Sequence, residues 1–138
     1  MAFQTTALVR FAHVDGAGIV FYPRYFEMLN GAVEDWFARD LGSDFHAMHS
    51  ARGIGVPTVQ LSAQFLAPSM LGEDLTIRLD ATRIGRSSCD YTAAFTCDGR
   101  DRVHVSATLV CMELAAQTAV PWPDDLRLAM SRHLMSAG

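Results

Sequence analysis

The chain has 138 residues, about the size of one common domain, and half of them are hydrophobic, so we expect a single folded domain over residues 1–138. Its 11 basic and 15 acidic residues give a formal net charge of −4 without a lysine- or arginine-rich run, so we expect no nucleic-acid partner. The sequence shows neither about 18 consecutive apolar residues nor a secretory signal at its start, so we expect no membrane association.

The three cysteines are expected to be free thiols. Cys89, Cys97 and Cys111 are odd in number, form no CxxC pair, and each falls in a strand-like run. A cysteine in such a run usually behaves as a small buried hydrophobe. We therefore expect neither a disulfide framework nor a zinc site, and a reducing compartment, the cytoplasm, suits the sequence.

The first part of the chain predicts a strand, a glycine loop and a long helix. Hydrophobic and polar residues alternate over residues 3–12, as in a strand with one exposed face. A compact loop over 13–18 follows. Pro23, whose missing N–H the first helical turn does not need, then opens an amphipathic helix over about 23–41. Gly31 costs this helix about 1 kcal/mol relative to alanine, so we expect another backbone to approach closely there.

The rest of the chain predicts four strands and a short helix. After a stretch with little pattern, alternation returns in four segments, at residues 57–66, 74–82, 88–97 and 102–114. Short turns join them, and Asp98-Gly99 is a good hairpin signal. An amphipathic segment over about 123–134 predicts a final short helix.

This order of elements indicates an α+β fold. Short turns make neighbouring strands antiparallel, and a helix of about five turns can cover one face of the sheet. Antiparallel strands with one covered face should alternate, and these do. The strand at 57–66 places four apolar residues on one face: Val59, Leu61, Ala63 and Phe65. The last strand also has apolar residues on its second face, which suggests burial in a subunit interface: Val110, Met112 and Leu114.

The loop before the long helix is the most informative candidate site. Asp15 lies among glycines just ahead of a helix start, where free backbone N–H groups and the helix dipole favour negative charge. A developing oxyanion is such a charge, and a neighbouring carboxylate can act as nucleophile or general base. The alternative is structural: Asp15 would only cap the helix, and the glycines would only shape a turn.

The segment from His13 to Tyr25 resembles the signature of the 4-hydroxybenzoyl-CoA thioesterase family of hotdog-fold proteins. In that signature an aspartate is followed three residues later by glycine, then by an apolar-aromatic run and a helix, as in DGAGIVFYPRY here. The resemblance extends to Pro68, Gly72 and Asp74 in the turn between the second and third strands. It implies a hotdog fold, one long central helix wrapped by a five-stranded antiparallel sheet, and hydrolysis of an acyl- or aroyl-CoA thioester.

The resemblance also implies roles for particular residues. Asp15 matches the catalytic carboxylate, and the backbone N–H of Tyr22 matches the donor that polarises the thioester carbonyl. Gly16 and Gly18 would let the backbone approach the substrate. Active sites in the family lie at a dimer interface where two sheets join edge to edge, so we expect a homodimer or homotetramer. No metal or cofactor is expected, because coenzyme A is part of the substrate and its thiol leaves readily as a thiolate.

Coenzyme A carries phosphates, so basic side chains should lie near the mouth of the pocket. The turn over residues 83–88 corresponds to the family's basic turn, and Arg83, Arg86, Ser87 and Ser88 are its candidate CoA-binding residues. The alternative is a solvated turn without a ligand. Some relatives have more basic residues at this turn.

Other polar residues are weaker candidates for the substrate site. His13 could influence the charge of Asp15 or line the pocket, Asn30 could face the distal end of the acyl group, and Thr58 could neighbour it. Because asparagine is a weaker acceptor than a carboxylate for a para-hydroxyl group, 4-hydroxybenzoyl-CoA itself is not the expected substrate. A metal site at His46 and His49 is not expected without a third ligand. The remaining histidines, His104 and His133, are expected to be ordinary surface residues.

Two other classes of function stay open at this point. The chain could act on acyl-carrier-protein thioesters, or on acyl-CoA by hydration or dehydration, although the latter usually needs a histidine paired with a carboxylate. It could instead be a non-catalytic acyl-CoA-binding module, which would keep the pocket without needing Asp15. The sequence leaves open whether the acyl group is aromatic, short or medium in length.

Overall fold

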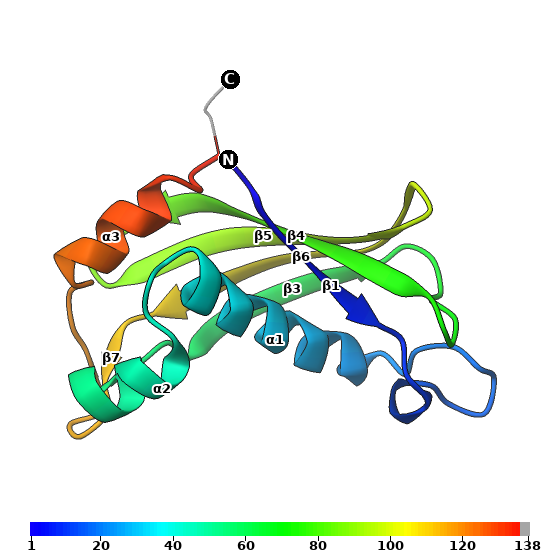
Figure 1. Ribbon diagram of the computed structural model, residues 1–138, viewed down its shortest axis with the longest axis horizontal. Coiled ribbons are helices and arrows are strands. Elements are labelled where there is room, and N and C mark those ends of the chain that lie inside the picture. The colour runs from blue at the N-terminus through cyan, green and yellow to red at the C-terminus, as the bar shows by residue number, and fades with distance from the viewer. Residues whose placement is uncertain (136–138) are drawn as a thin grey trace.

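The computed structural model describes residues 1–135, which form a five-stranded antiparallel sheet with one long helix across its face (Figure 1). The strand order is β1-β4-β5-β6-β3. The bounds of the sheet strands are β1 Phe3–Leu8, β3 Thr58–Phe65, β4 Asp74–Ile84, β5 Ser88–Cys97 and β6 Arg100–Val110. Helix α1 spans Pro23–Arg39. The predicted α+β class and the central helix are therefore confirmed.

The core lies between α1 and the covered face of the sheet. Alternate residues of β4, β5 and β6 are buried there, as a strand with one covered face requires. The buried stripe of α1 ends in Trp36 and Phe37, both completely inaccessible to solvent. Their large side chains anchor the helix over β5, where the Trp36 ring lies 6.5 Å from that of Tyr91. This packing fixes the direction of α1, and with it the position of its first turn.

The turns between strands follow the sequence signals. Asp98 and Gly99 both take positive φ angles, 52° and 73°, so the β5–β6 hairpin uses the turn that favours Asp-Gly. Gly42, with φ of 76°, stands just beyond the end of α1. The cysteines are buried and free, as predicted.

The first strand is shorter than predicted. It ends at Leu8 instead of Ala12, and a 3₁₀ turn, η1, covers Phe11–His13. The Arg10 N–H donates to the imidazole Nδ1 of His13 at 2.8 Å, a local bond that competes with continued strand pairing. As a result Phe11, expected on the buried face, is 82% exposed.

Strand β3 lies at the edge of the sheet, and its apolar face is not buried within this chain. Seven of its eight residues are exposed, including Val59 at 60% and Phe65 at 49%. It pairs only with β6 among the described strands, so one side of its backbone is free. The alternation predicted the strand correctly, but burial of that face needs something outside the protomer.

The segment before β3 and the C-terminal part form a smaller layer beside α1. Residues 43–56, which have little sequence pattern, form three short elements: α2 Phe45–Ala47, a π-helical turn η2 Met48–Arg52, and β2 Ile54–Gly55. Strand β2 joins β7 Met112–Glu113 and β8 Thr118–Ala119 in a small sheet. The predicted final helix is confirmed as α3, Asp124–Ser131.

His133, expected at the surface, is buried instead. Its ring lies against Trp36, and its Nδ1 is 2.9 Å from the backbone oxygen of Met1, so it joins the two ends of the described chain. No helix of the described residues is both long and apolar enough to cross a bilayer.

The close backbone approach expected at Gly31 is absent among the described residues. A Cβ atom built there meets nothing within 4 Å, and the position is exposed. Gly31 lines an open hollow of about 330 Å³ between β1 and α1.

Replacing Gly31 with alanine should therefore stabilise the protein. The substitution fills no occupied space and removes backbone freedom from the unfolded chain, so we expect a gain of up to about 1 kcal/mol in the free energy of unfolding. Urea unfolding should show a higher midpoint with an unchanged slope. A lower midpoint would contradict this and would indicate that another molecule contacts α1 at this position.

Candidate active site

A tight loop over residues 14–20 carries Asp15 at the end of the molecule where α1 begins (Figure 1). The Asp15 N–H donates to the Ile19 oxygen and the Gly18 N–H donates to the Asp15 oxygen, both at 3.0 Å. Gly18 has φ of 77°, in the left-handed region that favours glycine. These bonds close the loop on itself, so the position of Asp15 follows that of the loop.

The side chain of Asp15 is exposed and does not cap α1. Its Oδ1 accepts a hydrogen bond from the Ala17 N–H at 2.9 Å, which holds the carboxylate over its own loop. The N-cap residue of α1 is Tyr22. The prediction that Asp15 could cap the helix is therefore wrong, whereas its bond to Ala17 stabilises the turn of the loop.

The start of α1 leaves one backbone donor unpaired. Pro23 has no N–H, the Arg24 N–H donates to the Phe21 oxygen at 2.9 Å, and the Tyr25 N–H donates to the Tyr22 oxygen at 3.2 Å. The N–H of Tyr22 has no partner among the described residues. A free amide at the positive end of a helix dipole is suited to bind an anion or to polarise a carbonyl.

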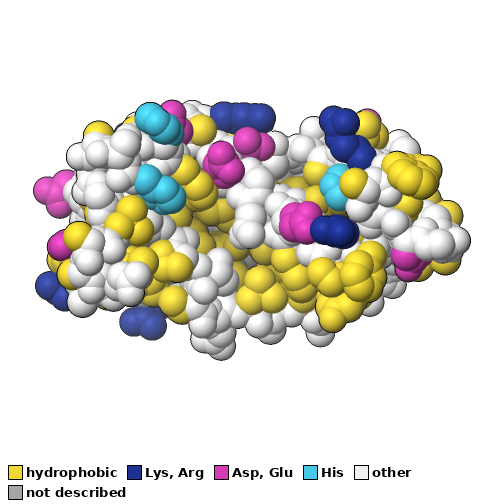
Figure 2. Space-filling view, turned by 90° about the horizontal axis from the view of Figure 1, so that it is seen from below, with side chains coloured by type: hydrophobic (Ala, Val, Ile, Leu, Met, Phe, Trp, Pro, Cys, Tyr) yellow, Lys and Arg dark blue, Asp and Glu magenta, His cyan; other side chains and the backbone are white. Residues whose placement is uncertain are grey.

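An apolar hollow of about 310 Å³ lies beside this helix start. Its lining comes from the loop, the first turn of α1 and the end of β3: Ile19, Val20, Tyr22, Tyr25, Phe65, Leu66, Ala67 and Pro68. The ring of Phe65 lies 5.8 Å from that of Tyr22 and 5.9 Å from that of Tyr25, so aromatic rings form one wall. Figure 2 shows hydrophobic side chains gathered at this end of the molecule. The volume is at the lower end of the roughly 300–1,000 Å³ typical of small-molecule sites.

The β3–β4 connection, residues 66–73, supports the loop. The Val20 N–H donates to the Ser69 oxygen at 2.9 Å, and the Leu71 N–H donates to the Gly18 oxygen at 3.3 Å. The hydroxyl of Tyr25, in the first turn of α1, donates to Ser69 Oγ at 3.0 Å. The loop and the helix start therefore rest on the same segment.

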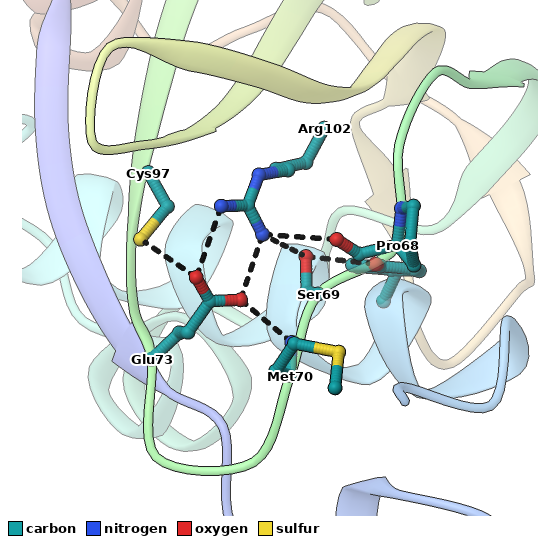
Figure 3. Close-up of polar contacts among 7 residues, drawn as sticks. Pro68, Ser69, Met70, Glu73, Cys97 and Arg102 are labelled. Atoms are coloured by element: carbon teal, nitrogen blue, oxygen red, sulfur yellow. Dashed lines mark hydrogen bonds and ion pairs between the residues drawn. The ribbon is translucent and has the colours of Figure 1, made fainter. Parts of the chain in front are cut away.

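Arg102 of β6 holds this connection from the other side (Figure 3). Its guanidinium makes a bidentate ion pair with Glu73, at 2.7 and 3.0 Å, and donates to the Pro68 oxygen at 3.0 Å and to Ser69 Oγ at 3.4 Å. Its backbone oxygen accepts from the N–H groups of Leu66 and Ala67. Arg102 is buried, so these contacts are little screened by solvent.

The ion pair shifts the titration of both partners. The hydrogen bond from Arg102, with a further bond from the Met70 N–H, lowers the pKa of Glu73 to about 2. The hydrogen bond to Glu73 raises the pKa of Arg102. Both groups therefore stay charged at any pH near neutrality.

The predicted CoA-binding turn lies at the opposite end of the sheet from Asp15. Strand β4 begins beside the connection that supports the loop and ends at Ile84, and its 11 residues span about 33 Å. Within the turn, the backbone oxygen of Arg86 accepts from the Trp122 N–H and from the Arg127 side chain. Arg83 and Arg86 are exposed, and Ser87 and Ser88, which follow Arg86, are half-buried. One protomer does not bring these residues together with Asp15.

The weaker substrate candidates also lie away from the apolar hollow. His13 lines the hollow between β1 and α1, and its Nδ1 is engaged by Arg10. Asn30 is exposed on α1, and Thr58 is exposed at the far end of β3 from Phe65. Gly16 is exposed in the loop. Among the described residues, the side chains of His13, Asn30 and Thr58 make no hydrogen bond to Asp15.

One cluster of metal-ligating side chain types occurs among the described residues, formed by Glu73, Cys97 and Asp98. Both carboxylate oxygens of Glu73 already accept hydrogen bonds from Arg102, and Cys97 Sγ lies 3.6 Å from one of them. The guanidinium supplies the positive charge that a metal ion would bring. The chemistry of this cluster therefore does not fit a metal site.

Sequence reasoning missed Phe65, Glu73 and Arg102 as parts of this region. The alternation at 57–66 places Phe65 in a strand without indicating which end of the strand meets the helix. Glu73 stands in a turn and Arg102 lies near the start of a strand, 29 positions apart, and no spacing rule links such a pair. Only the three-dimensional arrangement brings them together.

Comparison with known proteins places this geometry in context. Residues 9–130 match the profile of the Thioesterase-like superfamily. A 1,4-dihydroxy-2-naphthoyl-CoA hydrolase of Thermosynechococcus vestitus is 33% identical over 119 residues, which are 86% of this chain and 81% of that protein.

Solved structures show the same architecture. A gentisyl-coenzyme A thioesterase is 26% identical, with a TM-score of 0.82 over 94% of this chain and 99% of that one. A hypothetical protein from Thermus thermophilus is 25% identical, with a TM-score of 0.87 over 99% of this chain and all of the other. The hotdog arrangement predicted from the sequence is therefore confirmed.

The Glu73–Arg102 pair should make stability depend on pH. Because the pKa of Glu73 is lower in the folded protein than in the unfolded chain, the pair contributes stability above about pH 4.5 and loses it as the pH falls towards 2. The difference in free energy of unfolding between the wild type and Glu73→Gln should shrink by no more than about 3 kcal/mol over this window. Urea unfolding from pH 6 to pH 3 measures it, and a constant difference would contradict the assignment.

Proposed function

The chain belongs to the thioesterase-like superfamily, and from this we propose that it hydrolyses an aroyl-CoA thioester to the free acid and coenzyme A. Asp15 is the nucleophile or the general base toward water, and the Tyr22 N–H polarises the carbonyl. One observation carries the proposal: a carboxylate loop folds against a helix start whose unpaired amide borders an aromatic hollow. A thioester suits so sparse a site, because its thiolate leaves without a strong general acid.

The exposed edge of β3 supports a dimer as the active form. Its eight residues, TVQLSAQF, include no charge and no proline, the usual devices that prevent edge pairing. Apolar side chains on this edge, Val59, Leu61 and Phe65, would be covered by the same strand of a partner subunit. Pairing two identical edges about a twofold axis gives a continuous sheet, which satisfies both free backbones.

Such a dimer would also complete the substrate site. Antiparallel pairing of two β3 strands reverses the partner, so the partner's 83–88 turn would lie at the same end of the joined sheet as Asp15. The basic side chains Arg83 and Arg86 would then serve the CoA phosphates of the neighbouring subunit's site, with Ser87 and Ser88 as further donors. Each pocket would draw on both subunits, and the exposed Asp15 would face the cleft between them.

The aromatic wall favours an aromatic acyl group over a linear one. Tyr22, Tyr25 and Phe65 offer ring faces and edges for stacking, which gives aromatic ligands an advantage beyond area burial. The relatives that hydrolyse 1,4-dihydroxy-2-naphthoyl-CoA and gentisyl-CoA act on hydroxylated aromatic groups by name. We propose the same class for this chain, with 1,4-dihydroxy-2-naphthoyl-CoA as the first substrate to test.

Asp15→Ala should abolish most of the thiol release from aroyl-CoA. Loss of a nucleophile or general base should lower kcat by at least about 10²-fold, and Asp15→Asn should still bind substrate without turning it over. The assay is free-thiol release from a panel of acyl-CoA esters, with binding followed by calorimetry.

Asp44→Asn is a matched control for this experiment. Asp44, the N-cap residue of α2, is also an exposed aspartate that accepts a hydrogen bond from a backbone N–H, that of Ala47. Its replacement should leave kcat within about twofold, because Asp44 takes no part in the proposed chemistry. Equal activity of Asp15→Ala and wild type would exclude the assignment. Interconversion of enoyl- and hydroxyacyl-CoA without thiol release would favour a hydratase instead.

Arg86→Ala should raise KM for CoA esters about tenfold with little change in kcat, because it removes a charge-assisted contact to a phosphate. Mixing Asp15→Ala with Arg86→Ala subunits tests whether the two residues act across the interface. Mixed dimers would contain one intact site, so activity below KM should rise to about one quarter of wild type at a 1:1 ratio. Activity no higher than the average of the parents would contradict a shared site.

A further inference from the structure

A continuous set of hydrogen bonds connects β6 to the loop that carries Asp15. The loop bonds to the 66–73 connection through Val20 and Ser69 at one point and through Gly18 and Leu71 at another. The same connection is held by the guanidinium of Arg102. Between the strand and the loop, each step is a direct bond of 3.4 Å or less.

Ser69 is the junction of this path. It is fully buried, its backbone oxygen accepts from the Val20 N–H, and its Oγ accepts from both the Tyr25 hydroxyl and the Arg102 guanidinium. A single residue therefore receives bonds from the loop, from the first turn of α1 and from β6. Its position sets the separation between the loop and the amide of Tyr22.

We propose that the Glu73–Arg102 ion pair, acting through Ser69, positions the Asp15 loop against the start of α1 for catalysis. This inference rests on the proposed function, since it assigns Arg102 and Glu73 as positioning residues for that reaction. Neither side chain lines the apolar hollow, so neither contacts the acyl group. Their effect is on the geometry in which the carboxylate and the free amide reach one carbonyl.

The bonding geometry explains why arginine is required. The planar guanidinium reaches both carboxylate oxygens of Glu73 and, through one terminal nitrogen, the Pro68 oxygen and Ser69 Oγ (Figure 3). Lysine carries the same charge as a single point donor and cannot make this set of bonds. A displacement of the reacting groups by about 1 Å can lower the rate about 10²-fold, so loss of the guanidinium's set of hydrogen bonds should lower kcat.

Arg102→Lys tests the proposal. We expect kcat for aroyl-CoA to fall at least about tenfold while KM stays within about threefold, because the acyl pocket and the CoA turn keep their own residues. Ser69→Ala, which removes the junction hydroxyl without leaving a buried charge unpaired, should lower kcat in the same direction by a smaller factor. It also keeps the test decisive if Arg102→Lys fails to fold.

Arg52→Lys is the matched control. Arg52 makes a similar bidentate ion pair with Asp125, at 3.1 and 2.6 Å, which joins η2 to α3. This pair has no bond to the loop or to residues 66–73 among the described contacts. Its loss should leave kcat within about twofold, since a general loss of stability does not move Asp15. Equal effects of the two lysine variants on kcat would overturn the proposal.

Hydrogen exchange tests the positioning role of Arg102 independently of the proposed thioesterase activity. The amides of Gly18 and Val20 are bonded in the loop and to Ser69, so they should exchange slowly in the wild type and at least about tenfold faster in Arg102→Lys. Arg52→Lys should leave them unchanged. Faster exchange without any thioesterase activity in the wild type would uphold the positioning role and refute the function, whereas unchanged exchange would refute the positioning role alone.

Discussion

The hydrogen bonds between the loop at 14–20 and the connection at 66–73 are the constraint on which the rest of the site depends. The loop makes a ring of bonds within itself and one bond from the Val14 N–H to the Phe11 oxygen, and its further backbone hydrogen bonds among the described residues go to this segment, so local structure alone does not place Asp15. Helix α1 is fixed separately, by packing of Trp36 and Phe37 on the sheet. The carboxylate of Asp15 is therefore positioned by the loop and the free amide of Tyr22 by helix α1, and these two segments meet at Ser69. A site made in this way is accurate only if the connection is held rigidly, and a buried, bidentate ion pair is well suited to that task.

Much of the fold could be predicted because it depends on local periodicity. The alternation of apolar and polar residues predicted β4, β5 and β6, and the helical spacing of apolar residues after Pro23 predicted α1. Both patterns depend only on which face of the element is buried. The same reasoning failed at β1, where the bond from Arg10 to His13 ended the strand early. At Gly31, a glycine in the middle of a helix predicted a close backbone contact that is absent among the described residues. These errors have one origin, because local propensity carries no information about which partner, if any, occupies the neighbouring space.

The candidate site could be located but not assembled from the sequence. Asp15 and Tyr22 were found because a loop and a helix start adjoin along the chain. The sequence did not identify Phe65, Glu73 and Arg102, because they come from three elements that the sheet brings together. The 83–88 turn lies about 33 Å from the loop along β4. Neither the sequence nor one protomer alone explains how one ligand could contact both the turn and the loop. The unguarded edge of β3 supports the proposed dimer, in which the partner's turn would lie at the same end of the sheet as the loop.

The burial of the three cysteines has a consequence for a protein whose proposed substrate is a thioester. A thiolate near the pocket could attack the thioester carbonyl in place of water, so that coenzyme A leaves as the thiol and the acyl group stays on the protein. Cys89, Cys97 and Cys111 are buried, and burial raises the pKa of each thiol, so little of the reactive thiolate is present at neutral pH. The chain thus keeps its thiols in the core, where they contribute packing, and away from the surface, where the substrate could acylate them.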